Sequence, residues 1–315
     1  MQRLARRPTI SSSKLAQFTN YLMYRAMTTI KESPPAPWRQ LFVEHVQTMP
    51  SPEFTLSTVR KISTLPGPHH APPDIYYSPR ARTCVFRGMF AGLPVNPKND
   101  AELNPDEYES DYLTFTTDCR MDKMAELMGV DPGREQDENL KLTRRGELVE
   151  AAFWVKDTAT QWRVRGRAYV LGPDVDAPDA DAVKAVGELL LRMRRKQQSP
   201  ETGWSFGREV TAHFGNLSPL MRGSFRNPAP GTPVAAPVGD GRLKLGQKVT
   251  DLSDEVARAN FRLVVIAPLE VDRTDLSHPA RGRRWLYTYR GYGRREPNAP
   301  GGVVEDGWEK VEVWP

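Results

Sequence analysis

Eight short segments of the chain either alternate between apolar and polar residues or are rich in β-branched and aromatic residues. Both patterns are typical of β-strands, in which successive side chains point to opposite faces. The predicted strands lie at residues 54–61, 82–90, 112–117, 148–155, 160–171, 261–268, 285–290 and 308–313. The polar pair Lys156-Asp157 separates two of them and predicts a hairpin.

Three segments instead carry apolar residues at helical spacing, at residues 37–46, 120–128 and 181–196. Asp118 is placed to cap the second helix. The basic run at 192–196 suits the end of the third, where the helix dipole favours cations. So few helices among so many strands favour a mainly β fold with flanking helices, built as an antiparallel barrel.

Two Pro-rich stretches, at residues 65–79 and 227–241, interrupt this pattern. The second is interpreted as a flexible connector, because its density of Pro and Gly supports neither helix nor sheet. The sequence contains no internal repeat, and residues 31–315 are interpreted as a single domain.

Positive charge is concentrated at the N-terminus. Six of the 44 Lys and Arg residues, and none of the 39 Asp and Glu residues, lie in residues 1–31, which leaves the rest near neutrality. No nucleic-acid partner is expected, since such proteins spread positive charge over the folded domain. Residues 1–30 form a basic leader: a mitochondrial transit peptide, a disordered tail or sequence upstream of a true start at Met27. The protein is expected in the cytoplasm or in mitochondria.

Three further features narrow the class of protein. No apolar run approaches the roughly 20 residues of a membrane span, so no membrane association is expected. Two cysteines, Cys84 and Cys119, cannot form a disulfide framework and indicate a reducing compartment, where inert buried thiols are favoured over a reactive pair. The five histidines lack the spacing of a metal site, and no metal is expected.

Three stretches combine charge with an arrangement that suits a flat anionic ligand. Arg82 and Arg87 bracket a strand whose backbone would run along such a ligand. Residues 115–123 are read as strand, polar turn and helix start, where free N–H groups and the helix dipole attract anions. Residues 161–167 place Gln161 and three arginines on one strand face. Each stretch alone also fits solvated charges or a capped surface helix.

Together the three stretches resemble the FMN-binding family of pyridoxamine 5′-phosphate oxidase-like proteins, in particular its poorly characterised cyanobacterial and fungal members. The resemblance extends over most of residues 36–171 and 261–315, and ends at the C-terminal WEKVEVWP. It implies a split β-barrel that binds FMN, with an insertion at about residues 172–250.

The resemblance also implies which residues contact the cofactor. Arg82 and Arg87 match strand cations near the FMN phosphate and ring, and Lys123 matches a phosphate-binding lysine. Gln161 matches a glutamine that reaches FMN from the second subunit of a homodimer. The full implied set is Arg82, Val85, Phe86, Arg87, Thr116, Thr117, Lys123, Gln161 and Arg284.

The family's function implies an FMN-dependent oxidoreductase acting on a small molecule, with the flavin supplying the redox chemistry. The vitamin B6 oxidases proper bind the phosphate of their substrate with an Arg-x-His motif. The corresponding residues 278–284 of this chain read HPARGRR and do not contain that motif. Vitamin B6 oxidation is therefore not expected, and the substrate and catalytic residues stay unassigned. The alternatives are a non-catalytic flavin carrier or sensor on the same fold, and a structural barrel without a ligand.

Overall fold

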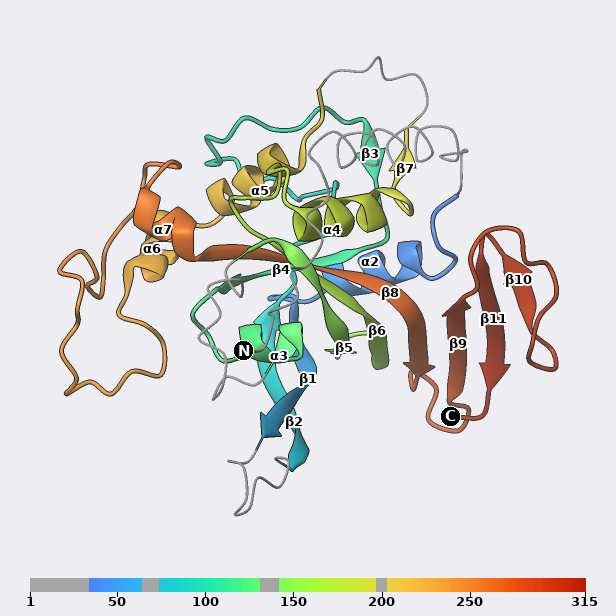
Figure 1. Cartoon of the computed structure of the whole chain (residues 1–315). Helices are drawn as coiled ribbons and strands as arrows, with labels where there is room; N and C mark the ends of the chain where they lie inside the picture. Colours follow the sequence, from blue (N-terminus) through green and yellow to red (C-terminus); the bar gives the residue numbers. More distant parts are fainter. Residues whose placement is uncertain (1–33, 64–73, 131–141, 197–202) are drawn as a thin grey trace, which may run out of the picture.

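The computed structural model describes residues 34–63, 74–130, 142–196 and 203–315 (Figure 1). Within them, the main feature is an antiparallel sheet, and a small second ladder joins β3 (Tyr108–Glu109) to β7 (Arg194–Arg195). In the main sheet β4 (Leu113–Asp118) pairs with β8. The other strands follow the order β10 (Val303–Glu305), β11 (Trp308–Val313), β9 (Arg283–Tyr289), β8 (Phe261–Asp275), β6 (Thr160–Leu171), β5 (Arg144–Val155), β1 (Glu53–Ser63) and β2 (Ile75–Val85).

The sheet curls round and closes into a barrel. The chain that follows β2 runs beside β4, where the backbone N–H of Arg87 donates to the carbonyl of Thr114 at 2.8 Å. The N–H of Thr114 donates in turn to the carbonyl of Gly88 at 3.1 Å. Because β4 also pairs with the first half of β8, the strands β4, β8, β6, β5, β1 and β2 form a closed ring. The predicted antiparallel β-barrel is confirmed.

From Leu263 onwards the first half of β8 is a continuous apolar run, because both of its faces are buried. Val264 and Ile266 belong to the cluster inside the barrel, together with Phe153. Leu263 and Val265 belong to a second cluster, which packs outside the barrel against helices. A strand covered on both faces loses the alternation of a half-exposed one.

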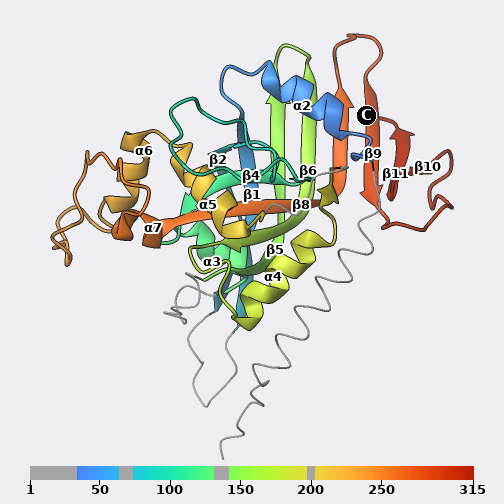
Figure 2. The ribbon, with the colours of Figure 1, turned by 90° about the horizontal axis from the view of Figure 1, so that it is seen from above.

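Helices fill the space around the barrel. α2 (Arg39–Gln47) packs Phe42 into the inner cluster. α4 (Ala180–Leu190), α5 (Phe206–Gly215) and α7 (Glu255–Asn260) contribute to the second cluster outside β8, and Figure 2 shows α4 and α5 lying along that side. The remaining short helices are α3 (Lys123–Met128), α6 (Pro219–Gly223) and the 3-10 turn η3 (Ser224–Arg226).

The predicted helix at 181–196 is too long. α4 ends at Leu190, and the basic run after it turns back instead of closing the helix. Arg194 is buried in β7, where its guanidinium donates to the carboxylate of Asp111 at 2.5 and 2.8 Å. A buried arginine requires such a partner, so ion pairing rather than the helix dipole decides the course of this run.

The predicted start of the second helix and the predicted extent of the second strand also change. α3 begins at Lys123, and Asp118 binds Arg120 instead of capping it. β2 begins at Ile75, inside the first Pro-rich stretch, because residues 75–85 pair with β1 throughout. Pro79 is tolerated there since β2 ends the sheet order.

Several expectations fall on parts of the chain that the structure does not describe. The basic leader, residues 1–30, lies outside the described residues, as do residues 64–73 of the first Pro-rich stretch. Of the helices that are described, none has both the length and the apolar character needed to cross a membrane.

Candidate functional site

A cavity of about 620 Å³ lies between the barrel and residues 217–245. Its volume falls within the range of about 300–1,000 Å³ that is usual for small-molecule sites. β2 and the residues after it form one wall, and the end of β4 with the turn to α3 forms another. Five of the residues implied to contact FMN line it, namely Val85, Arg87, Thr116, Thr117 and Lys123.

Arg87 brings an uncompensated positive charge to this cavity. Its Nε is buried and has no hydrogen-bond partner among the described residues. Burial lowers the pKa of the guanidinium, and no carboxylate in the described part of the chain opposes that effect. Because an isolated buried charge is unfavourable, the position of Arg87 favours an anionic ligand in the cavity.

Lys123 is the second cation of the cavity. Its Nζ donates to Oγ1 of Thr117 at 3.2 Å and to Sδ of Met121 at 2.8 Å. Burial lowers the pKa of the ammonium group. Neither Lys123 nor Arg87 forms an ion pair with a carboxylate in the part of the chain described. Two such cations beside a threonine hydroxyl are the kind of donor set that binds phosphate.

The aspartates near these cations are held by other residues. Asp118 lines the cavity, but its carboxylate accepts hydrogen bonds from Nε and Nη2 of Arg120 at 2.9 and 2.6 Å. Asp122 is largely exposed and lies 3.3 Å from Nη1 of Arg60. Pairing of Asp118 with Arg120 reduces the repulsion that a free carboxylate would exert on a bound phosphate.

Arg82 lies beside the cavity but does not line it. Its guanidinium pairs with the buried carboxylate of Glu126 on α3 and donates to Oγ1 of Thr58 at 2.5 Å. Nε of Arg80 lies 3.7 Å from the other oxygen of the same carboxylate. Sequence reasoning missed Glu126, because its partners lie on β1 and β2, far away along the chain.

Three more of the implied residues also lie elsewhere. Phe86, whose backbone the resemblance implies to lie along the FMN ring, does not line the cavity, and its side chain points into the barrel, where its ring centroid lies 5.8 Å from that of Phe42. Gln161 and Arg284 lie on the outer face of the sheet, away from the cavity lining. Nε and Nη2 of Arg284 donate to the carboxylate of Asp272 at 3.0 and 2.9 Å.

The outer face runs from the cavity towards Gln161. Thr83, Thr55, Ala152 and Arg163 lie in register across β2, β1, β5 and β6, and therefore share one face. Thr83 lines the cavity, whereas Arg163 is three strands away, or about 14 Å. Gln161 shares the face and the strand of Arg163, so it does not reach the cavity of its own subunit.

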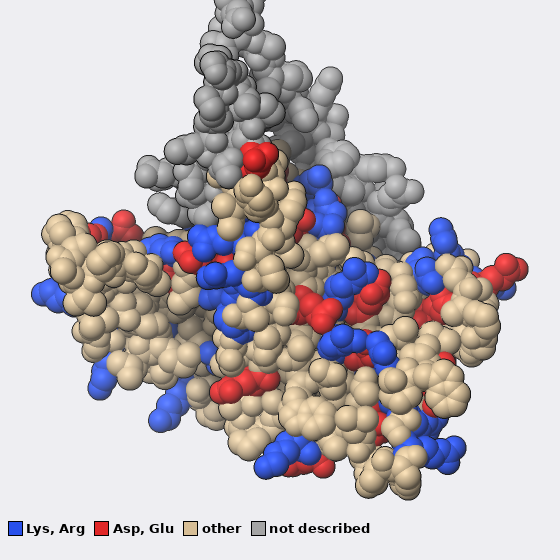
Figure 3. Space-filling model, turned by 90° about the horizontal axis from the view of Figure 1, so that it is seen from below, with Lys and Arg blue, Asp and Glu red and all other residues tan. Residues whose placement is uncertain are grey.

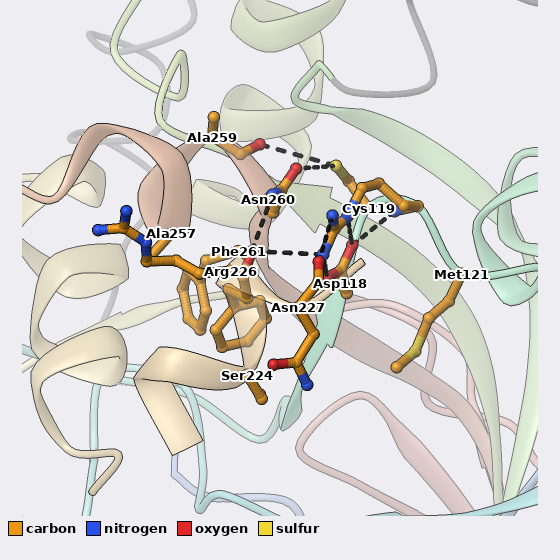
Figure 4. Close-up of polar contacts among 12 residues, drawn as sticks. Asp118, Cys119, Met121, Ser224, Arg226, Asn227, Ala257, Ala259, Asn260 and Phe261 are labelled. Atoms are coloured by element: carbon orange, nitrogen blue, oxygen red, sulfur yellow. Dashed lines mark hydrogen bonds and ion pairs between the residues drawn. The ribbon is translucent and has the colours of Figure 1, made fainter. Parts of the chain in front are cut away.

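The remaining wall of the cavity comes from within the segment interpreted as an insertion at about residues 172–250. Arg120 donates to the carbonyl oxygens of Asn227 and Phe225 at 2.9 and 3.3 Å. Nδ2 of Asn260 also donates to the carbonyl of Phe225, at 2.8 Å (Figure 4). The stretch interpreted as a flexible connector carries no helix or strand, but these bonds fix its start against the turn after β4.

Comparison with known proteins points in one direction. Residues 35–172 match a family model described as pyridoxamine 5′-phosphate oxidase, FMN-binding domain. The uncharacterized protein YGR017W of Saccharomyces cerevisiae is 20% identical over 331 residues, which cover 89% of this chain and 98% of that protein. A crystal structure from Nostoc punctiforme, of a pyridoxamine 5′-phosphate oxidase-related, FMN binding protein, matches with a TM-score of 0.50 at 20% identity. That match covers 90% of this chain and 100% of the other.

Proposed function

Residues 35–172 belong to the pyridoxamine 5′-phosphate oxidase FMN-binding family, and we propose that the protein is an FMN-dependent oxidoreductase whose cofactor occupies the cavity beside Lys123. Membership confirms the predicted family and its cofactor, FMN. The observation that carries the placement is the pair of cations, Arg87 and Lys123, which face one cavity without a carboxylate bound to either among the described residues.

The residues present fit FMN. Arg87 and Lys123 would hold the phosphate, with Thr117 adding a hydroxyl, while Val85 and Thr116 would border the rest of the cofactor. Once bound, the flavin would accept or donate a hydride at its N5 atom. The protein would bind and orient the cofactor and exclude water from it.

A homodimer is the second part of the proposal. The implied FMN contacts of Gln161 and Arg284 require a partner subunit, because both residues lie on the exposed outer face, beyond reach of their own cavity. Thr274 pairs with both of them, so the two side chains share a row and a face. A second subunit packed against this face would bring its own cofactor towards Gln161 and Arg284.

A flavin carrier is the second candidate. No histidine is among the described residues that line the cavity. The carboxylate among them, that of Asp118, is paired with Arg120. Burial raises the pKa of the Cys84 thiol, which keeps it protonated at neutral pH. The described lining therefore provides no histidine, free carboxylate or thiolate for proton transfer. This is expected of a carrier, and also of an enzyme whose chemistry resides on the flavin.

The cofactor is tested first. Purified protein is expected to show a flavin absorption spectrum and to release FMN, identified by mass, on denaturation. Arg87→Ala and Lys123→Ala are each expected to weaken FMN binding about 10- to 100-fold, since each removes a charge-assisted contact. Arg208→Ala is the control, because Arg208 pairs at the surface with Glu102. Protein that neither carries FMN nor binds it when added would refute the proposal.

Catalysis is tested separately on the FMN-loaded protein. An oxidoreductase is expected to pass through repeated cycles of flavin reduction and reoxidation with an amine, alcohol or reduced nicotinamide as donor. Bound FMN that is never turned over by any of these donors would support the carrier.

A further inference from the structure

We propose that residues 217–245 form a substrate wall, which selects an uncharged and largely apolar molecule that hydrogen-bonds to the side-chain amide of Asn227. The inference rests on the proposed function, because the wall closes the same cavity in which FMN is placed. It names the class of substrate for that cavity and one residue that recognises it.

The substrate wall is apolar where it faces the cavity. Its larger lining side chains include Leu217, Met221, Phe225, Val234, Val238 and Leu245. No Lys, Arg, Asp or Glu of residues 217–245 is among the described lining residues. A ligand with a second phosphate or another strong charge would therefore find no counter-charge on this side, and its desolvation would be uncompensated.

None of the charged residues of the wall is among the described residues that line the cavity. Arg226 pairs with Asp254 at 2.6 Å, and Arg242 pairs with Asp240 at 2.9 Å. On the face shown in Figure 3, charges of both signs are interspersed over the centre, whereas the side carrying α6 and the substrate wall is mostly uncharged. The apolar character therefore belongs to the wall itself and is not a local gap between charges.

The wall also exposes large apolar side chains beside the cavity. Val234 is fully exposed, and Leu245 is 77% exposed. Val238 and Met221 are exposed to a lesser degree. All four line the cavity. An apolar ligand would remove part of this surface from water, which is favourable at about 25 cal/mol per Å².

Asn227 is the polar exception within this wall. Its Oδ1 is buried and has no hydrogen-bond partner among the described residues. Its backbone is held in place, because its carbonyl accepts from Arg120 and its N–H donates to the carbonyl of Ser224 at 3.1 Å (Figure 4). A buried amide oxygen without a donor is costly, and a ligand O–H or N–H group that donates to it would relieve the cost.

The wall is separate from the part of the chain that defines the family. The family match ends at residue 172, whereas the wall begins at residue 217. The cations that would hold FMN lie within the match, at Arg87 and Lys123. Cofactor binding and substrate selection are therefore assigned to different segments, which can be altered independently.

The test uses FMN-loaded protein and two probes, 2-naphthol and pyridoxal 5′-phosphate. The first probe, 2-naphthol, is flat, uncharged at neutral pH and largely apolar, with a hydroxyl group that can donate to Oδ1 of Asn227. Pyridoxal 5′-phosphate is of comparable size but anionic. Binding is followed by the change in the flavin absorption spectrum. We expect 2-naphthol to bind at least tenfold more tightly than pyridoxal 5′-phosphate, and Asn227→Ala to weaken 2-naphthol binding about tenfold, the loss of one hydrogen bond of about 1.4 kcal/mol.

A matched pair of variants separates the wall from general effects. Val234→Asp places a charge on the wall and is expected to weaken 2-naphthol binding at least tenfold. Val303→Asp makes the same change on β10, at a valine that is 61% exposed and outside the cavity, and is expected to leave 2-naphthol binding unchanged. FMN content should stay the same in these two variants and in Asn227→Ala.

The outcomes distinguish the two proposals. Protein that retains FMN but binds pyridoxal 5′-phosphate as tightly as 2-naphthol, or does not bind 2-naphthol at all, overturns the substrate wall and leaves FMN binding intact. Unchanged 2-naphthol binding in Asn227→Ala overturns the role of that amide. Protein that cannot hold FMN ends the proposed function, and the substrate wall with it.

Discussion

The three cations near the cavity differ in whether the protein itself neutralises them. Arg82 is paired with Glu126, whereas Arg87 and Lys123 have no carboxylate bound to them among the described residues. Both free cations are partly buried, and burial lowers the pKa of each. Without a bound anion, the protein would keep two charges in an unfavourable place, which is usual where a site is organised for a ligand at some expense of stability.

Replacing Arg87 should separate stability from binding. Arg87→Leu is expected to leave the FMN-free protein as stable as the parent or more so, because an uncompensated charge is replaced by an apolar side chain. The same variant should lose the stabilisation by added FMN, which for the parent reaches about 2.7 kcal/mol at a hundredfold excess over Kd. Thermal unfolding with and without FMN measures both. Arg208→Leu should behave like the parent, and an Arg87→Leu protein that FMN still stabilises would contradict the assignment.

The lowered pKa of Lys123 predicts a pH dependence of cofactor affinity. Lys123 should lose its proton below the ordinary lysine pKa of about 10.4, so FMN affinity should fall as pH rises through the lowered value. Between the lowered pKa and the ordinary one, Lys123 of the FMN-free protein is protonated in the unfolded chain but not in the folded one. The free energy of unfolding therefore rises with pH over this range. Affinity should also fall below about pH 6, where the FMN phosphate gains a proton. Titrations of FMN across pH measure both limits.

Lys123→Arg provides the control for that titration, because arginine stays charged over the whole range. It should keep the fall in affinity at low pH and lose the fall at high pH. An alkaline fall that persists in Lys123→Arg would assign it to another group.

Among the secondary-structure elements, α3 depends on contacts with β1 and β2 rather than on its own length. It has six residues, too few for a stable isolated helix. Glu126 on α3 accepts from Thr58 of β1 and pairs with Arg82 of β2. This carboxylate therefore fixes the helix that carries Lys123 to the edge of the barrel.

Breaking that contact should cost stability more than cofactor affinity. Glu126→Gln leaves Arg82 without its anion and is expected to lower the free energy of unfolding by about 3 kcal/mol. The double variant Glu126→Leu with Arg82→Met, which removes both charges, should recover much of that loss. Denaturant unfolding of the FMN-free proteins measures the difference. A double variant as unstable as the single one would show that the pair itself, and not the stranded charge, supplies the stability.

The sequence predicted those elements whose pattern is set by local burial. The hairpin of β5 and β6 alternates because one face of each strand packs in the barrel, as Phe153 and Val164 do. The course of the basic run at 192–196 could not be predicted, because Arg194 finds its partner, Asp111, 83 residues away. For the same reason the sequence marked the insertion at 172–250 but not which of its residues face the cavity: the wall at 217–245 is anchored by the contact of Arg120 with Asn227, 107 residues along the chain.

For the whole molecule, the outer face of the sheet is the surface on which the proposed dimer depends. Trp154 is 51% exposed on this face and pairs in register with Gln161. Exposed tryptophans are among the residues that most often stabilise protein interfaces. The charges around them are largely paired within the subunit, as Arg284 is with Asp272.

Association should therefore be sensitive to Trp154. The parent protein is expected to be a dimer by light scattering, and Trp154→Arg is expected to be a monomer with weakened FMN binding. Gln161→Ala should stay dimeric and lose about 1 kcal/mol of FMN affinity, the contribution of one hydrogen bond. The exposed Trp314, which is 92% accessible at the chain end, serves as control through Trp314→Arg. A monomeric parent with tight FMN binding would rule out a contribution from a partner subunit.

The closure of the barrel has one further consequence. The ring is joined by backbone hydrogen bonds between residues 87–90 and residues 112–114, and Arg87 lies on one side of this seam. Lys123 follows the strand on the other side. A phosphate held by both would act as a cross-link over the weakest join of the ring, so loss of the cofactor would allow the two edges to separate more readily than any other pair of neighbouring strands.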